Sequence, residues 1–185
     1  SLSNTDYTGW HSKGFVSVLR SLEYLHRTAR VLHCDIRPAN ILASKLNEFC
    51  IVDFGYAVHL EETTEHDTYV RSNYVGTPKY SPQEHLERGL GNGPYVYSPA
   101  TDLESFVKTV YMCMLSNQAR HKITFLARGD SAADIPKVKS WWDDIFKNDP
   151  FASAMIKCAR SRDYQGLVNV LQNHLAKFLH AFDAV

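Results

Sequence analysis

The chain has 185 residues, of which 44% are hydrophobic and 22% charged, so it is long enough to bury a core of its own. Twenty basic residues balance twenty acidic ones, and this neutrality favours neither nucleic acid nor an acidic membrane surface as a partner. No apolar run is long enough to cross a bilayer, and the four cysteines form no C-x-x-C pair. We therefore expect one globular domain over residues 1–185, in an intracellular protein, cytoplasmic or nuclear, that binds neither nucleic acid nor membrane.

Apolar periodicity predicts a mainly α-helical chain with one small β-hairpin. The first helix begins near Phe15, where apolar residues recur every three or four positions. The β-prone runs "NIL" and "FCIV" follow and predict the two strands of the hairpin. Residues 56–81 and the run "GLGNGPYVYSPAT" have no sustained period, which predicts irregular segments, the first of them exposed and mobile. Helical patterns resume at about residues 102–115 and continue in "IPKVKSWWDDIF", "DPFASAMIKCARS" and "YQGLVNVLQNHLAKFLHAF".

Three polar residues flank the predicted hairpin. Asn40 precedes its first strand and Asp53 follows its second, so the hairpin would set the carboxamide and the carboxylate side by side. Such oxygen ligands suit Mg²⁺, which fills its remaining positions with water and phosphate. Asp35 lies five residues before Asn40, within reach of the same ion, and could accept a proton from an attacking hydroxyl group. The pattern thus predicts a site for a metal ion and a phosphate group.

These residues resemble the signature motifs of the eukaryotic-type protein kinases. "HCDIRPAN" is similar to the catalytic loop H-R-D-x-x-x-x-N, and "DFG" at residues 53–55 is similar to the metal-binding triplet. "GTPKYSPQE" resembles the G-T-x-x-Y-x-A-P-E end of an activation segment. Asp102 stands where the family has the aspartate that braces the catalytic loop from a buried helix. The resemblance implies the helical carboxy-terminal lobe of the kinase fold, with a loop like the activation segment at about residues 53–84.

The resemblance also implies a reaction, namely phosphoryl transfer from ATP, with Mg²⁺, to a protein substrate. It makes Asp35 the catalytic base and Arg37 the cation that steadies the transferred group. Asn40 and Asp53 become the ligands of the metal and, through it, of the nucleotide. Thr77 would shape the loop that docks the substrate, which favours serine or threonine over tyrosine as the acceptor.

Further residues receive structural roles from the same resemblance. His33 would pack and hydrogen-bond to orient the catalytic loop, and Gly55 completes the DFG triplet. Glu84 would form an ion pair with a later arginine, and its spacing leaves both Arg160 and Arg162 as candidates.

The chain departs from the family pattern in three respects. "SPQE" replaces "APE" with the proline shifted by one position, a change that we expect to affect the path of the loop more than the role of Glu84. Cys34 replaces the arginine that in many members holds a phosphorylated activation segment, so we do not expect control by phosphorylation there. No Gly-rich loop and no V-A-I-K lysine precede the first helix, so the lobe that covers ATP has no counterpart here. We therefore expect the chain by itself to transfer phosphate poorly or not at all. The missing lobe, or another protein partner, would cover an apolar cleft floor near Leu42 and Val52.

Two other functions remain open at this point. A kinase-like lobe without its partner lobe could act as a non-catalytic binding or decoy module. A small-molecule kinase of the aminoglycoside or choline phosphotransferase type would also carry an H-x-D-x-x-x-x-N loop and a later metal-binding aspartate. The run "GTPKYSPQE" argues against this last class, because it resembles a segment that docks protein substrates.

Overall fold

The structure is a computed structural model that describes residues 12–43, 48–61, 67–89, 91–115 and 134–182. Its helices and strands are, in chain order, α1 (Ser12–Arg27), β1 (Val31–Leu32), η2 (Pro38–Asn40), β2 (Ile41–Ala43), β3 (Phe49–Ile51), β4 (Val58–His59), β5 (Tyr69–Asn73), η3 (Pro78–Tyr80), α2 (Gln83–Glu87), β6 (Asn92–Tyr97), α3 (Pro99–Met114), α6 (Ile135–Asn148), α7 (Pro150–Arg160) and α8 (Tyr164–Phe182). The predicted mainly helical architecture is confirmed.

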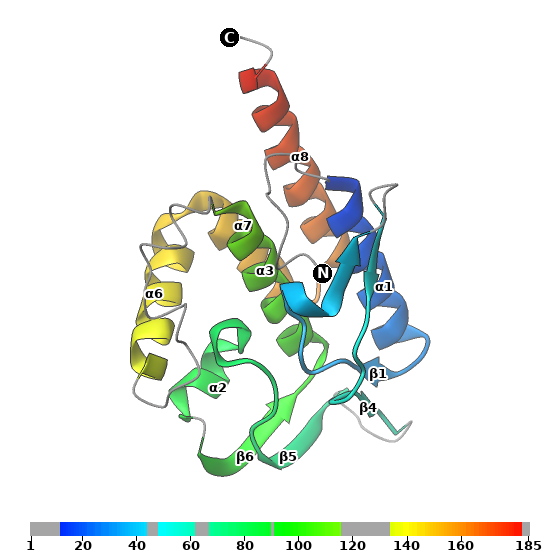
Figure 1. The fold of residues 1–185 in the computed structure, drawn as a ribbon, viewed down its shortest axis with the longest axis vertical. Helices are drawn as coiled ribbons and strands as arrows, with labels where there is room; N and C mark the ends of the chain where they lie inside the picture. Colours follow the sequence, from blue (N-terminus) through cyan, green and yellow to red (C-terminus); the bar gives the residue numbers. More distant parts are fainter. Residues whose placement is uncertain (1–11, 44–47, 62–66, 90, 116–133, 183–185) are drawn as a thin grey trace.

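Helix α3 runs through the middle of the molecule, with α6 on one side and α1 on the other (Figure 1). It begins with Pro99 at its first position and a capping box, in which the backbone N–H of Ser98 donates to Thr101 Oγ1 over 2.9 Å. Most of its side chains are buried, including the polar residues Asp102 and Lys108. A buried charge is unfavourable unless it is paired inside the protein. These polar side chains therefore hold the segments that they bind in place against α3.

The main core forms where α1, α3, α7 and α8 pack together. The apolar face predicted for the first helix is buried there, and Phe15 packs edge-to-face on Phe49 of β3, with ring centroids 5.1 Å apart. Burial of each such side chain contributes about 1.5–3 kcal/mol. The buried apolar residues of this core are Phe15, Val16, Val18, Leu19, Leu22, Ile36, Ile41, Phe49, Ile51, Leu103, Phe106, Val107, Val110, Cys113, Met155, Ile156, Ala159, Tyr164, Leu167, Val168 and Leu171.

A second cluster packs α6 against α2, α3 and η3. Trp142 is fully buried in it, stacks on Phe146 with ring centroids 5.4 Å apart, and donates its indole N–H to Lys79 O over 2.8 Å. Helix α7 follows after a single linking residue, Asp149, whose carboxylate caps it by accepting the N–H of Ala152. Among the helices that the structure describes, none is both long and apolar enough to span a membrane.

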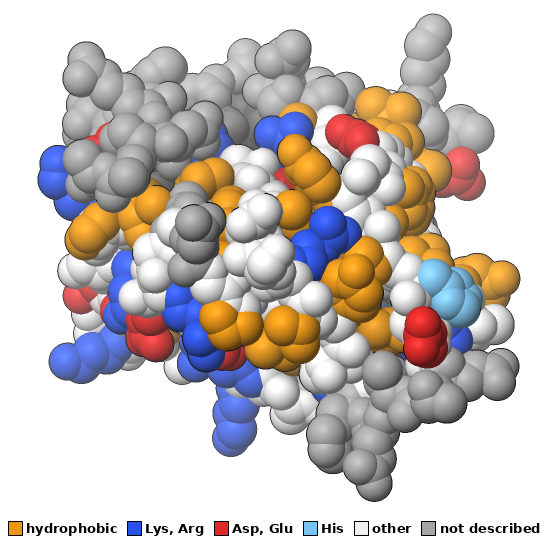
Figure 2. All heavy atoms as spheres, turned by 90° about the horizontal axis from the view of Figure 1, so that it is seen from below, with side chains coloured by type: hydrophobic (Ala, Val, Ile, Leu, Met, Phe, Trp, Pro, Cys, Tyr) orange, Lys and Arg blue, Asp and Glu red, His pale blue; other side chains and the backbone are white. Residues whose placement is uncertain are grey.

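The strands form three antiparallel pairs. β2 and β3 pair with Ile41 opposite Ile51, which confirms the predicted hairpin. β1 pairs with β4, and β5 pairs with β6 so that Tyr69 lies opposite Tyr97. The last pair lies at the lower end of the molecule, and the face seen from below carries small groups of hydrophobic side chains among polar and basic ones (Figures 1 and 2).

The irregular character expected for residues 56–81 and for the run before α3 was wrong where β4, β5 and β6 form. The pattern is hidden because four of the five residues of β5 are exposed, so no alternation of apolar and polar residues marks the strand. The phenol group of Tyr97 adds to the pairing, since it accepts the N–H of Val75 and donates to Val75 O, both over 2.9 Å. Strand pairing therefore holds the described part of this segment.

Candidate active site

The loop of residues 33–40 links β1 to β2 and is held in place by one carboxylate of α3. Asp102 of α3 accepts the backbone N–H groups of His33 and Cys34, over 2.6 and 2.9 Å. Its Oδ2 also lies 3.0 Å from Nε2 of the buried His26. Burial by itself would raise the pKa of Asp102, but the hydrogen bonds from His26 and from the backbone N–H of His33 hold it below its usual value. The ionised carboxylate can thus keep Cys34 at a φ of 65°, a backbone conformation that is uncommon for a residue other than glycine.

His33 joins this loop to the end of β3. Its Nδ1 accepts the backbone N–H of Asp35 over 3.3 Å, so the proton of the neutral ring lies on Nε2, which donates to Val52 O over 3.1 Å. His33 is fully buried and packs edge-to-face on Phe54. These contacts match the orienting role expected for it, because one ring links the residue before Asp53 to the backbone of Asp35.

The carboxylate of Asp35 is 6% exposed and held from several sides. Thr77 Oγ1 donates to Oδ1 over 2.9 Å, and Asn40 Nδ2 donates to Oδ2 over 3.0 Å. Arg37 forms an ion pair with Oδ2, with its Nε 3.1 Å away. A carboxylate with these partners has a fixed orientation and little room to rotate. The structure therefore brings Asp35, Arg37, Asn40 and Thr77 together, as the motifs predict.

Asn40 and Asp53 are brought to one end of the β2–β3 hairpin. Val52 N donates to Asn40 O over 2.9 Å, which links the chain just before Asp53 to Asn40. The amide group of Asn40 donates twice to Asp35, to its backbone carbonyl over 2.9 Å and to its carboxylate. Its Oδ1 accepts no hydrogen bond from any residue that the structure describes. That oxygen is therefore available to a cation.

Asp53 lies at the surface with a φ of 65°. Its Oδ1 accepts the N–H of Gly55 over 3.3 Å, and a β-carbon on Gly55 would come within 3.2 Å of this same oxygen. The glycine thus leaves room for the carboxylate beside its own backbone. Two hard oxygen donors, from Asn40 and Asp53, suit Mg²⁺ with water and phosphate as its other ligands.

A second close approach joins the loop of residues 33–40 to residues 76–83, which we call the docking loop after the role that the resemblance implies. Gly76 has a φ of 112°, and a β-carbon there would lie 3.0 Å from Cys34 O. Glycine is required on both counts. Cys34 itself is buried, and burial raises the pKa of its thiol, so it is unreactive at neutral pH.

The ion pair expected for Glu84 was wrong. Glu84 is exposed and pairs with Arg88 on its own helix, over 3.1 Å. Arg160 instead contacts Glu104 of α3, over 3.4 Å, and Arg162 contacts Asp67 over 3.4 Å. The proline of "SPQE" is displaced by one position relative to the family pattern, and this places Gln83 rather than Glu84 against the core.

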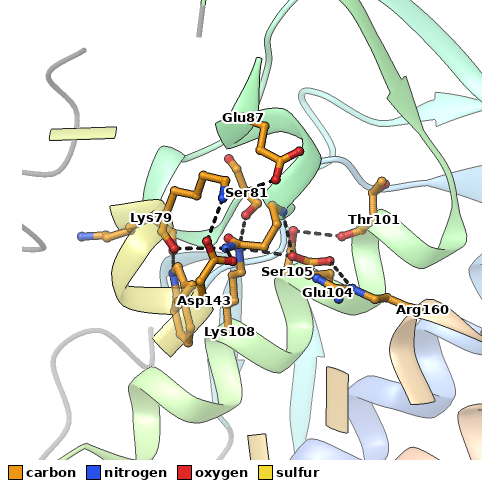
Figure 3. Close-up of polar contacts among 12 residues, drawn as sticks. Lys79, Ser81, Glu87, Thr101, Glu104, Ser105, Lys108, Asp143 and Arg160 are labelled. Carbon is orange, nitrogen blue, oxygen red and sulfur yellow. Dashed lines mark hydrogen bonds and ion pairs between the residues drawn. The ribbon is translucent and has the colours of Figure 1, made fainter. Parts of the chain in front are cut away.

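Sequence reasoning missed a second cluster of polar residues beneath the docking loop. Gln83, Glu104 and Lys108 are all buried and in mutual contact, with Glu104 Oε1 accepting the N–H of Gln83 over 2.8 Å. Figure 3 shows Glu104 and Lys108 on α3 together with Ser81 of the docking loop. The only sequence signal is a glutamate and a lysine four residues apart in a mostly apolar helix, which by itself indicates a surface ion pair.

Large hydrophobic side chains lie exposed near the metal-binding candidates. Leu42 of β2 and Phe54 are each 45% exposed, whereas Val52 is half-buried. The apolar floor expected near Leu42 is thus open to solvent in this chain. Phe54 extends it on the side of Asp53.

A family model for the "Protein kinase domain" matches residues 9–164. Among curated relatives, the chain is 36% identical over 98 residues to "Mitogen-activated protein kinase kinase 1c" of Physcomitrium patens, which covers 53% of this chain and 25% of the relative. It is 35% identical over 89 residues to "Mitogen-activated protein kinase kinase 7" of Arabidopsis thaliana, covering 48% of this chain and 27% of that protein. It is 39% identical over 77 residues to "Serine/threonine-protein kinase dkf-1" of Caenorhabditis elegans, covering 40% and 10%.

The chain spans about a quarter of the length of the two plant kinases that it matches. The family model covers most of the chain and includes the loop of residues 33–40, the DFG triplet, the docking loop and α3. The helical architecture and the carboxylate-braced loop agree with this match. The chain belongs to the protein kinase family.

Proposed function

We propose that this chain is the catalytic, carboxy-terminal lobe of a serine/threonine protein kinase, which in its complete form transfers the γ-phosphoryl group of ATP to protein hydroxyls. The observation that carries the proposal is the environment of Asp35. Its carboxylate is nearly buried yet held by Thr77, Asn40 and Arg37 within 3.1 Å. Such preorganisation suits a group that must meet a hydroxyl proton in one orientation.

The roles of the side chains follow from their chemistry. The oxygen of the acceptor hydroxyl forms a bond to the γ-phosphorus, the bond from phosphorus to the β–γ bridging oxygen breaks, and ADP leaves. Asp35 accepts the hydroxyl proton. Arg37, half-buried beside Asp35, supplies positive charge where the transferred oxygens gather negative charge.

Asn40 and Asp53 are the residues that would hold Mg²⁺. The side-chain oxygen of Asn40 and the exposed carboxylate of Asp53 fit this ion, because its preferred ligands are a few protein oxygens together with water and phosphate. When bound, the ion would neutralise charge on the phosphate groups.

The presence of Thr77 favours serine or threonine over tyrosine as the residue that accepts the phosphoryl group. The hydroxyl group of Thr77 donates to Asp35, so the docking loop and the catalytic carboxylate are linked directly. The name of the matched Caenorhabditis elegans relative, a serine/threonine-protein kinase, supports the same choice.

We further propose that the chain alone is a poor catalyst. Phosphoryl transfer depends on positioning, and the Gly-rich loop and strand lysine that position ATP in the family have no counterpart in the sequence. The exposed side chains of Leu42 and Phe54 mark where an amino-terminal lobe or a protein partner would cover the cleft.

The experiment is transfer of labelled phosphate from ATP, with Mg²⁺, to a generic basic protein, comparing the chain with its Asp35→Asn variant. We expect no transfer above the level of the variant. Mg²⁺-dependent transfer that the variant lacks would show the chain to be active alone and refute its inactivity. Equal, clear transfer by both proteins would refute Asp35 as the catalytic base. An exposed surface variant, Asp144→Asn, serves as the matched control.

A further inference from the structure

Lys108 is fully buried in the middle of α3 and reaches the backbone of the docking loop. Its Nζ donates to Ser81 O and, over 2.9 Å, to Gln83 Oε1. Glu104 Oε1 lies 3.4 Å from the same Nζ. A buried ammonium group is unfavourable unless it is paired and hydrogen-bonded. Here its hydrogen bonds go to the docking loop and its ion pair lies on its own helix.

Two aromatic rings also lie close to this ammonium group. Its Nζ lies 5.4 Å from the ring centroid of Trp142 and 5.8 Å from that of Phe146, both on α6. Trp142 also donates to Lys79 O over 2.8 Å. Side chains from α3 and α6 thus bind the carbonyl groups of Lys79 and Ser81, and together they fix the backbone of the docking loop (Figure 3).

Gln83 fits this pocket because it is an amide. Its side-chain oxygen accepts from Lys108, while its Nε2 donates to Asp143 Oδ1 over 2.6 Å and to Lys139 O over 3.1 Å. Its backbone N–H donates to Glu104 over 2.8 Å. A glutamate at this position would place a third carboxylate beside those of Asp143 and Glu104, and the repulsion would be unfavourable in a buried site.

The carboxylate that anchors this end of the docking loop is therefore that of Glu104, on α3. Glu104 Oε2 lies 3.4 Å from Arg160 Nε, so the arginine of α7 binds α3 and not the docking loop. The docking loop is held instead by Lys108 and by the hydrogen bond from the backbone N–H of Gln83.

The same helix also fixes the catalytic loop. Six residues before Lys108, Asp102 binds the N–H groups of His33 and Cys34, and Thr109 Oγ1 donates to Ile36 O over 3.3 Å. Thr77 links the two loops directly, since it belongs to the docking loop and donates to Asp35 of the catalytic loop.

We propose that Lys108 is a positioning residue for the substrate. Its ammonium group sets the position of the docking loop relative to Asp35. In this role it replaces an acidic residue of the segment at about residues 53–84. The proposal rests on the function proposed above in so far as the loop binds substrate. Its physical content, the coupling of Lys108 to Thr77 and Asp35, does not depend on activity.

Titration of Lys108 provides the means to test this coupling. Burial lowers the pKa of Lys108 to about 8, against the opposing effect of Glu104. The other charged groups that face it are Arg160 of α7, which lowers the pKa further, and Asp143 of α6, which raises it. Above pH 8 the lysine becomes neutral, and its hydrogen bonds to Ser81 and Gln83 are no longer strengthened by the charge of the ammonium group.

The experiment is an NMR titration of the ¹⁵N-labelled chain between pH 6.5 and pH 9.5. We expect the amide signals of Gln83, Thr77 and Asp35 to shift together with a midpoint near pH 8, and these shifts to vanish in Lys108→Met. The control Lys137→Met removes an exposed lysine of α6 and should leave the titration unchanged. A shift confined to Gln83, or a common shift that persists in Lys108→Met, would refute the positioning role.

A second variant separates positioning from simple stabilisation. Lys108→Met with Glu104→Gln removes both buried charges, so it should unfold at a temperature closer to that of the wild type than Lys108→Met does. It should still lack the common titration of Thr77 and Asp35. Recovery of that titration in the double variant would overturn the proposal. If the metal ion fails to bind at Asn40 and Asp53, the function proposed above fails, whereas the titration of Lys108 is unaffected.

Discussion

Replacement of Asp102 by alanine should be among the most destabilising single changes in this chain. The carboxylate is 2% exposed and accepts the N–H groups of His33 and Cys34 and the imidazole of His26. Alanine would leave these three donors without their acceptor in a buried place. Each unsatisfied buried group costs about 1–3 kcal/mol, and partial relaxation reduces the sum, so we expect a loss of about 3–5 kcal/mol in the free energy of unfolding.

Urea denaturation followed by circular dichroism measures this loss, with the amide signals of His33 and Cys34 as a local readout. Asp102→Asn should cost less than Asp102→Ala, because asparagine keeps one acceptor oxygen. The control Asp144→Ala removes an exposed carboxylate and should change the free energy of unfolding by less than about 0.5 kcal/mol. A loss below about 1 kcal/mol in Asp102→Ala, with unchanged amide signals, would refute the bracing role of this residue.

Three further outcomes are expected. The pKa of Lys108 is lowered to about 8, so above that pH the unfolded chain binds more protons than the folded chain. In urea melts between pH 8 and pH 10, the free energy of unfolding of the wild type should therefore rise relative to that of Lys108→Met. A constant difference between the two proteins would contradict this. Burial lowers the pKa of His85 from its usual 6.5, so stability should fall as the pH drops below 6.5, and the same melts on His85→Phe should show a smaller fall. The exposed Leu42 should promote self-association, which sedimentation at high concentration should detect in the wild type and find reduced in Leu42→Ser; a strictly monomeric wild type would disprove it.

Much of this fold could be predicted because its helices bury one continuous face each. The periodicity from Phe15 onward corresponds to α1, and the two short β-prone runs correspond to the β2–β3 hairpin. The pair of β5 and β6 gave no such signal. Its strands join residues 19 to 28 positions apart, and β5 is exposed at four of its five positions, so it leaves no period in the sequence.

The candidate site divides in the same way. Asp35 and Asn40 stand in one short motif and contact each other, and Asn40 is hydrogen-bonded to the residue before Asp53, so spacing together with the resemblance predicts that these residues are neighbours. The ion pair of Glu84 with Arg160 or Arg162 was mispredicted, because a one-residue displacement in "SPQE" moves Gln83 inward and leaves Glu84 exposed. Only tertiary packing places Glu104, from another helix, next to Arg160.

Binding of a divalent metal by Asn40 and Asp53 is tested most directly by titration of the ¹⁵N-labelled chain with Mn²⁺ in the presence of ATP, since the paramagnetic ion broadens the signals of nearby amides. We expect the amides of Asn40, Asp53 and Gly55 to broaden first, and this selectivity to disappear in Asp53→Ala. Earliest broadening at exposed carboxylates elsewhere, such as Asp144, with no difference between the wild type and Asp53→Ala, would contradict the assignment of this site.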